Sequence, residues 1–226
     1  MIKKKIKTIL ISGASEGIGK AIALKFLKKG FLVLGIGRNK KKLDAIKHDS
    51  FIGIVADLSK KETFADLKNV LDSYHFDILV NNAGVFIPGK LSDEKEGIYE
   101  QTMQTNIDSA YYLTRLVIPK INVGGYIFNM CSTASQMGYP NGGSYCISKF
   151  ALLGFTKALR EEFKGKIAVS AIMPGATYTN SWADSTEPKE RFIKPNDIAE
   201  IIYTAYKIRK HTVVEEIVLR PHLGDF

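Results

Sequence analysis

The chain has 226 residues, of which 45% are hydrophobic and 24% are charged, ordinary values for a soluble globular protein. This length suits one undivided α/β domain with a full core. The two cysteines and four scattered histidines show neither a disulfide framework nor metal-ligand spacing, so the sequence predicts no metal site.

The net charge of +9 comes from 32 basic and 23 acidic residues, partly through lysine runs such as Lys40-Lys41-Lys42. No nucleic-acid-binding motif accompanies these runs, so a solvated surface is the better interpretation and we expect no nucleic-acid partner. A basic nucleic-acid-binding module remains an alternative, and it predicts retention on DNA that weakens steeply with salt. The apolar stretch near the N-terminus is interrupted at Lys7, which predicts no membrane span and a cytoplasmic protein.

Short apolar runs alternate with longer amphipathic ones. The apolar runs predict strands at residues 6–11, 31–36, 51–56, 76–80, 125–130, 167–172 and 213–219. The amphipathic runs predict helices at residues 17–29, 39–46, 59–72, 103–117, 145–163 and 195–209, and a further helix that starts near residue 92. Asn39 and Ser59 are the predicted N-caps of the second and third helices. Such alternation predicts one Rossmann-type, doubly wound parallel sheet of about seven strands over residues 1–226, with residues 180–194 as an irregular substrate loop.

A glycine loop, Ser12 to Gly19, joins the first predicted strand to the first predicted helix. Glycine permits tight turns and lets the backbone approach a phosphate closely, and the free N–H groups of a helix start then face that phosphate. The spacing is GxxxGxG rather than GxGxxG, although the mechanics are the same. The loop therefore predicts a dinucleotide-binding site.

The second predicted strand ends in Gly37-Arg38, where sites for NAD usually carry an acidic residue. Arg38 offers a charged, bidentate partner for a 2′-phosphate, so the sequence favours NADP(H). Glu16 in the glycine loop argues the other way, because a carboxylate close to a 2′-phosphate repels it. An exposed loop arginine with no cofactor role is the alternative for Arg38.

Tyr145 and Lys149 are four residues apart in a predicted helix, so both side chains reach the same point in space. A lysine ammonium at roughly 4 Å contributes about 4 kcal/mol at an effective dielectric near 20, or about 3 pK units. We therefore expect Lys149 to lower the pKa of Tyr145 towards neutral pH, where a phenol is an efficient acid/base. The same spacing also occurs on ordinary amphipathic helix faces.

Together these motifs resemble the short-chain dehydrogenase/reductase family in its compact form, over nearly the whole chain. Asn81-Asn82-Ala83-Gly84 resembles the family's NNAG segment, which stabilises the central sheet and lines the cofactor site. Ser132 stands thirteen residues before Tyr145, the family's usual spacing, and Ser135 is the less favoured candidate. The resemblance implies the catalytic residues Asn106, Ser132, Tyr145 and Lys149. It also implies cofactor-binding residues: Gly13, Ser15, Gly17, Ile18, Gly19, Arg38, Asp57, Leu58, Asn82, Ala83, Gly84, Tyr145, Lys149, Pro174, Gly175, Thr177 and Thr179.

The resemblance further implies an NADP(H)-dependent oxidoreductase that reduces a carbonyl or oxidises a secondary alcohol. Tyr145 is then the acid/base, Ser132 binds the carbonyl oxygen, and Asn106 holds a water that relays protons to Lys149. Family members commonly form dimers and tetramers, so we expect a homodimer or homotetramer. A non-catalytic NADP(H)-binding sensor or scaffold is the alternative.

The identity of the substrate is left open, and we expect residues 85–91 and 180–193 to determine it. Five residues are candidates for lining an apolar substrate pocket, with simple packing as the alternative role: Phe86, Met137, Tyr139, Trp182 and Phe192.

Overall fold

A computed structural model describes residues 6–182, 185–208 and 211–224. Its centre is a seven-stranded sheet in the order β3-β2-β1-β4-β5-β6-β7. Every neighbouring pair of strands is parallel, which confirms the doubly wound α/β fold. The strands are β1 (Thr8–Ser12), β2 (Leu32–Gly37), β3 (Phe51–Val55), β4 (Phe76–Asn81), β5 (Ile121–Met130), β6 (Ile167–Pro174) and β7 (Glu216–Leu219).

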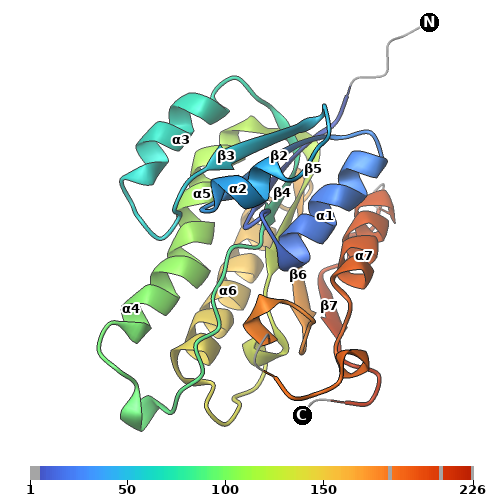
Figure 1. The fold of residues 1–226 in the computed structure, drawn as a ribbon. Coiled ribbons are helices and arrows are strands. Elements are labelled where there is room, and N and C mark those ends of the chain that lie inside the picture. The colour runs from blue at the N-terminus through green and yellow to red at the C-terminus, as the bar shows by residue number, and fades with distance from the viewer. Residues whose placement is uncertain (1–5, 183–184, 209–210, 225–226) are drawn as a thin grey trace, which may run out of the picture.

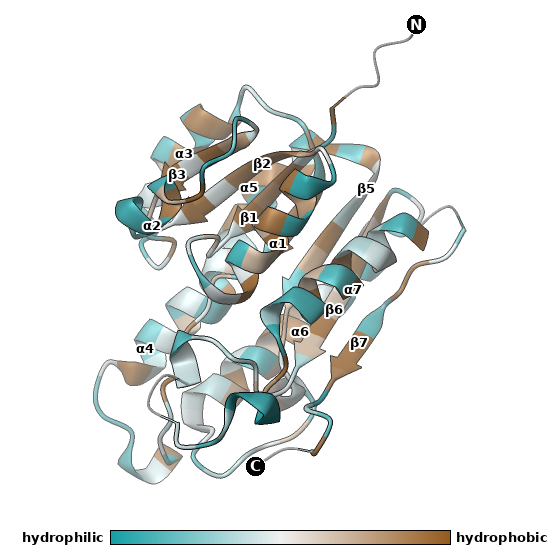
Figure 2. Cartoon of the chain, turned by 45° about the vertical axis from the view of Figure 1, so that its right-hand side comes forward, coloured by the Kyte–Doolittle hydropathy of each residue, from teal (hydrophilic) through white to brown (hydrophobic). Residues whose placement is uncertain are grey.

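Helices cover both faces of the sheet, because successive strand residues point to opposite sides. Ile9 packs in a cluster with α1 (Gly17–Lys28) and α7 (Pro195–Ile208). Its neighbour Leu10 packs in a second cluster with α3 (Thr63–Leu71), α5 (Ser109–Val117) and α6 (Gly143–Glu162). Figure 1 shows these two helical layers, and Figure 2 shows apolar colour in the strands between them. Burial on both faces explains why the strands read as continuous apolar runs.

Two predicted helix caps have different outcomes. Asn39 caps α2 (Lys40–Asp44) as predicted, since its side-chain oxygen accepts the N–H of Lys42 at 3.0 Å. The prediction of Ser59 as a cap is wrong, because α3 begins at Thr63. The backbone N–H and hydroxyl of Ser59 both donate to the Asp57 carboxylate, at 3.1 and 2.8 Å. That local hydrogen bonding favours a turn over a helix start.

The predicted helix starts near Ser92 and at Met103 are wrong, whereas the predicted end at Val117 is confirmed. Residues Leu91–Asp93 form only a 3-10 turn, and α4 (Ile98–Met103) starts after Gly97, whose φ of 84° is left-handed. Nothing breaks the helix at Met103. Instead α4 passes through a π turn, Gln104–Asp108, into α5. The π turn widens the helix where Asn106 is buried.

The last helix begins at Pro195 as predicted, whereas the last strand is shorter than predicted. Helix α7 is described to Ile208, and the predicted end at Arg209 lies outside the described residues. Strand β7 begins at Glu216 rather than Val213, because the Val214 carbonyl accepts the hydroxyls of Ser170 and Tyr126 in place of a ladder bond. Residues 180–194 are irregular as predicted, with 3-10 turns at Asn180–Trp182 and Lys189–Arg191; residues 183 and 184 lie outside the described part.

Candidate functional site

A cleft runs across the carboxyl ends of the strands, where open α/β sheets bind ligands. It comprises two adjoining hollows of about 230 Å³ and about 300 Å³, whose walls share Ile18, Asn82, Gly84, Thr179 and Ser181. The smaller hollow is lined by the predicted residues Gly13, Ser15, Gly17, Ile18, Arg38, Asp57, Leu58, Asn82, Ala83, Gly84 and Thr179. The larger is lined by Ile18, Asn82, Gly84, Ser132, Tyr145, Lys149, Pro174, Gly175, Thr177 and Thr179.

The glycine loop between β1 and α1 leaves room for backbone only. Gly13 and Gly17 have φ angles of 68° and 54°, a region that side chains rarely adopt. Gly19 does not belong to either wall, but a Cβ there would lie 2.1 Å from the Gly13 oxygen. The loop therefore forms a cradle in which the first N–H groups of α1 face the smaller hollow. This cradle fits the pyrophosphate of a dinucleotide.

Ser12 and Asn82 tie the glycine loop to the end of β4. The Ser12 hydroxyl accepts the N–H groups of Asn82 and Ala83, each at 2.9 Å, and donates to the Val80 carbonyl at 3.4 Å. The Asn82 amide in turn donates to the Ser12 and Gly13 carbonyls, at 2.9 and 3.1 Å. The sequence placed Ser12 only at the start of the glycine loop; the available signal for its structural role was a hydroxyl at the end of a predicted strand.

Arg38 and Glu16 both line the smaller hollow, from the loops that follow β2 and β1. Arg38 is exposed and has no ion pair among the residues that the structure describes. Glu16 is engaged, because its carboxylate accepts hydrogen bonds from the Lys42 ammonium and the Asn180 amide. The negative charge that argued against a 2′-phosphate is therefore compensated within the protein, and the Arg38 guanidinium is available.

Lys149 is 5% exposed, and its ammonium donates to the Met130 carbonyl at 2.8 Å. The Lys149 Nζ also lies 5.6 Å from the centroid of the Tyr145 ring. Sequence analysis missed Met130, since a backbone carbonyl at a strand end leaves no mark in the sequence. The carbonyl fixes the ammonium at the base of the larger hollow, beneath the phenol.

The pKa values of this pair are shifted by burial. Burial raises the pKa of the Tyr145 phenol to about 12, although the neighbouring Ser132 hydroxyl opposes the rise. Burial also lowers the pKa of the Lys149 ammonium to about 8. Both shifts have one cause, which is that the charged form loses its water. The expectation that Lys149 brings the pKa of Tyr145 towards neutral is wrong for this structure, because burial dominates the shift and Lys149 is not among the groups that lower the pKa of the phenol.

Asn106 lies in the π turn and is 1% exposed. Its side-chain oxygen accepts the Val85 N–H at 2.7 Å, and its amide donates to the Val85 carbonyl at 3.0 Å and to the Ser148 hydroxyl at 2.9 Å. Ser148 then donates to the Tyr145 carbonyl at 2.7 Å. Neither wall, as the described residues define it, includes Asn106. Its side chain links the loop after β4 to the first turns of α6, and sequence analysis missed Val85 and Ser148 as its partners.

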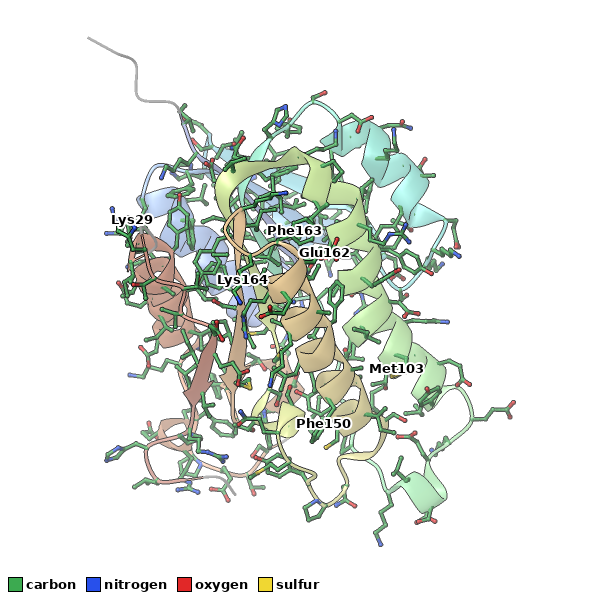
Figure 3. All side chains as sticks on the ribbon, turned by 180° about the vertical axis from the view of Figure 1, so that it is seen from behind. Lys29, Met103, Phe150, Glu162, Phe163 and Lys164 are labelled. Atoms are coloured by element: carbon green, nitrogen blue, oxygen red, sulfur yellow. The ribbon has the colours of Figure 1, made fainter. Side chains whose placement is uncertain are left out.

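The start of α6 is held by Glu94, which sequence analysis also missed. The Glu94 carboxylate accepts the Ser144 N–H at 3.0 Å and the Ser144 hydroxyl. A Cβ on Gly143 would lie 2.6 Å from the Glu94 carboxylate, so only glycine leaves room for this contact. In Figure 3, Phe150 marks the early turns of α6 and Glu162 marks its end. Glu94 therefore positions the turn that presents Tyr145.

A buried polar network supports the strands beneath the site. The Asn81 amide donates to Asn129 on β5 and to Thr114 on α5, both at 2.8 Å, and the Asn129 amide donates to Thr156 on α6 at 2.9 Å. These bonds join β4 and β5 to α5 and α6, in keeping with the sheet-stabilising role that the resemblance implied for the NNAG segment.

Aromatic rings form the outer wall of the larger hollow. Phe86 lies edge-on to Tyr145 at 4.8 Å between ring centroids and stacks on Trp182 at 6.1 Å, which meets Phe192 at 5.4 Å. Of the five candidate pocket residues, Phe86, Tyr139 and Trp182 line the hollow, whereas the walls do not include Met137 or Phe192.

Among the described residues, no helix is long and apolar enough to cross a membrane and no acidic, cysteine or histidine cluster could hold a metal ion.

The parallel sheet, the glycine cradle and the serine, tyrosine and lysine in one hollow define a dinucleotide-binding α/β protein. The family model for short chain dehydrogenases matches residues 7–190. The chain is 34% identical to a sepiapterin reductase of Chlorobaculum tepidum, over 96% of this chain and 97% of that protein. It therefore belongs to the short-chain dehydrogenase/reductase family, whose members are oxidoreductases that use nicotinamide cofactors.

Two solved structures show how widely the fold is shared. An alcohol dehydrogenase of the archaeon Thermococcus sibiricus, complexed with 5-hydroxy-NADP, has a TM-score of 0.90 at 25% identity and covers 98% of this chain and 99% of its own. A 4-hydroxyisoleucine dehydrogenase mutant complexed with NADH and succinate has a TM-score of 0.87 at 28% identity, covering 97% and 100%. One of these structures holds an NADP derivative and the other holds NADH, so a preference of this chain for NADP(H) or NAD(H) has to be argued from its own residues.

Proposed function

We propose that this protein is an NADP(H)-dependent oxidoreductase that transfers hydride between nicotinamide and a carbonyl or secondary alcohol. The observation that carries the proposal is the position of Ser132, Tyr145 and Lys149 in one hollow, which adjoins the hollow of the glycine cradle. The cofactor, when bound, supplies or accepts the hydride. The protein supplies orientation, proton transfer and electrostatic stabilisation.

Tyr145 is the proton donor in the direction of reduction. A pKa of about 12 keeps its phenol protonated at neutral pH, so a proton is available for the oxygen of a carbonyl as negative charge develops there. The Ser132 hydroxyl is beside the phenol and donates to the same oxygen. Lys149 contributes positive charge below the phenol, and Asn106 acts as a positioning residue that braces the turn carrying Tyr145.

NADP(H) is favoured over NAD(H) by the charge at the end of β2. Arg38 faces the smaller hollow with its guanidinium unpaired by any described acid, and Lys42 and Asn180 compensate Glu16. A 2′-phosphate there gains charge-assisted hydrogen bonds and meets no free carboxylate. The cofactor bound to the Thermococcus sibiricus neighbour is of the same phosphorylated type.

We also propose a homo-oligomer. Tyr111 on α5 and Ile147 and Phe150 on α6 are 39%, 42% and 47% exposed, and α5 and α6 lie side by side over one face of the sheet. Large apolar side chains on adjacent helices form a surface that a second copy would cover. Light scattering after gel filtration tests this, and a Phe150→Glu variant with a lower mass than wild type is the expected result.

The test of the activity is NADPH oxidation over a carbonyl panel, with sepiapterin included because a relative is named for it. We expect Tyr145→Phe to lower kcat by about 10²–10⁴-fold, because the proton donor is lost. The Kd for NADPH should change by less than about twofold, since one hydroxyl is removed and the cradle is untouched. Retained turnover in this variant, or a chain that binds no NADPH, would contradict the proposal.

A further inference from the structure

Glu16 lines the smaller hollow, where a carboxylate would repel the phosphates of a dinucleotide. Within the protein this carboxylate has two partners. It accepts hydrogen bonds from the Lys42 ammonium on α2 and from the side-chain amide of Asn180. Glu16 therefore joins three parts of the chain that are far apart in sequence: the glycine loop, α2 and the segment that follows β6.

The segment after β6, residues 175–182, runs along both hollows, and we call it the crossing segment. Three of its residues, Thr179, Asn180 and Ser181, line the smaller hollow. Two of these, Thr179 and Ser181, also line the larger hollow. In Figure 1 the crossing segment, drawn in orange, lies beside the start of α1. A Cβ on Gly17 would lie 3.3 Å from the Thr179 methyl carbon, so the crossing segment packs directly on the glycine loop.

The crossing segment is also attached near each of its ends. Close to β6, the Ala176 carbonyl accepts the Ile193 N–H at 2.9 Å. At the other end, the Trp182 ring stacks on the Phe86 ring with 6.1 Å between their centroids. The bond to the glycine loop is made between these two attachments. The aromatic contact holds the segment beside the larger hollow, whereas the bond from Asn180 holds it against the smaller one.

Lys42 fixes the carboxylate oxygen that Asn180 uses. The same atom, Oε2 of Glu16, accepts from both donors, so the ammonium holds this oxygen within reach of the amide. The Glu16 and Lys42 side chains are each 45% exposed. Ion pairs at such exposure add little to stability, so the role of this pair is orientation rather than support of the fold.

We propose that Glu16 is a positioning residue that fastens the crossing segment over the smaller hollow through Asn180, and that this contact slows release of the nicotinamide cofactor. The inference rests on the proposed function only in taking NADP(H) as that cofactor. The cofactor leaves past a wall that includes residues 179–181, and a segment that is held more weakly opens more often. Because the contact is partly exposed, its loss should change rates by about threefold.

Trp182 gives a measurement on the free protein. It is the chain's single tryptophan and lies two residues after Asn180, so acrylamide quenching of its emission reports how often the crossing segment opens. We expect Asn180→Ala and Glu16→Ala each to raise the quenching constant about twofold, and the double variant to raise it no further, because one contact is lost in all three. Glu16→Gln keeps an oxygen for the Asn180 amide and should stay near the wild-type value.

The second measurement is the release of NADPH, followed by its fluorescence on mixing with excess NADP⁺. We expect Asn180→Ala to raise the rate constant of release about threefold and to leave the association rate constant within about twofold. In the Glu16→Ala background, Asn180→Ala should have no further effect. An equal increase in both backgrounds would show that Asn180 acts on the cofactor directly, and it would overturn the inference.

The control variant is Glu62→Ala, which removes a carboxylate from an exposed position outside both walls. It should change neither quenching nor release. Independent effects of Glu16→Ala and Asn180→Ala on the quenching constant, or no effect of either, would also overturn the inference.

The quenching experiment separates this inference from the proposed function, because it needs neither cofactor nor turnover. If Glu16 and Asn180 act as one unit in quenching and release but no carbonyl supports NADPH oxidation, the proposed activity fails and the positioning role stands. If carbonyls are reduced while the two substitutions act independently, the activity stands and the positioning role fails. A chain that binds no NADPH would overturn both.

Discussion

The two hollows of the cleft are lined by different kinds of residue. The smaller hollow is lined by the loops that follow β1, β2, β3 and β4, with glycines at Gly13 and Gly17 where the backbone has a positive φ. The larger hollow is formed by side chains from four segments far apart in the chain, represented by Phe86, Ser132, Tyr145 and Trp182. A phosphate needs N–H groups and open space, whereas a substrate needs particular side chains brought together.

This difference decides how each end responds to change. The glycine cradle has no room for an added side-chain atom at Gly19. Arg38, which is exposed, contributes a single charge to the cofactor site. The substrate end is buried and depends on hydrogen bonds that position its side chains. Substitutions in the cradle should therefore affect cofactor binding, and substitutions at the substrate end should affect turnover while leaving the cofactor bound.

The largest effect is expected for Gly19→Ala. The new Cβ would meet the Gly13 carbonyl at 2.1 Å and the Asn82 amide at 2.6 Å, so the loop has to move. We expect NADPH affinity to fall by more than about 100-fold and the free energy of unfolding to fall by about 1–3 kcal/mol. Gly154→Ala is the control, since nothing lies within 4 Å of a Cβ there. Wild-type NADPH affinity in Gly19→Ala, measured by calorimetry, would refute the cradle.

Arg38→Asp should reverse the cofactor preference. The change removes a cation and adds a carboxylate that repels a 2′-phosphate and can bind ribose hydroxyls. We expect the ratio of kcat/KM for NADPH to kcat/KM for NADH to fall by about 100-fold. Lys41→Asp makes the same change in net charge at an exposed position outside either wall, and it should leave the ratio within about twofold. An equal drop in both variants would indicate a general field effect.

Ser148→Ala tests the substrate end. The variant removes the acceptor of the Asn106 amide and the donor to the Tyr145 carbonyl, so the first turns of α6 lose their brace. We expect kcat to fall about tenfold with the Kd for NADPH unchanged, and the free energy of unfolding to fall by about 1 kcal/mol. Ser73→Ala, at an exposed serine, is the control. A loss of NADPH affinity with an unchanged kcat would contradict the positioning role.

The remaining effect expected is a pH dependence of stability. The Lys149 pKa is about 8 in the folded protein against 10.5 ordinarily, so between these values the unfolded chain holds a proton that the folded protein has lost. Stability therefore rises with pH across this window. Tyr145, raised from 10.0 to about 12, acts oppositely above pH 10. Urea unfolding at several pH values should show a shallower rise for Lys149→Met than for wild type, with exposed Lys166→Met as the control.

Most of the fold could be predicted from the sequence because its strands are buried on both faces and its loops carry glycine. The predicted strands all exist, and the cap at Asn39 is confirmed. The errors fall where tertiary contacts override a local signal. Asp57 captures the hydroxyl of Ser59, and the π turn at Asn106 carries a helix past the point where the sequence suggested a start.

The candidate site divides in the same way. The glycine loop and the spacing of Tyr145 and Lys149 are local sequence patterns, so the sequence alone predicts them as site residues. Glu94 lies 50 residues before Ser144, and no spacing rule connects them. The pKa of Tyr145 also depends on burial, which a helical spacing does not report. Helical spacing therefore predicted Tyr145 and Lys149, and the resemblance added Ser132, which lines the same hollow. Glu94 was missed because it meets the start of α6 only after folding.

The Ser12 hydroxyl holds the N–H groups of Asn82 and Ala83 with no cofactor needed for either bond. Both amides should therefore exchange slowly with deuterium in the free protein. The floor of the cleft is then ordered before a nicotinamide cofactor binds, and the conformational entropy of ordering it is lost during folding rather than on binding. A single oxygen atom at the end of β1 thus makes the cofactor site preorganised.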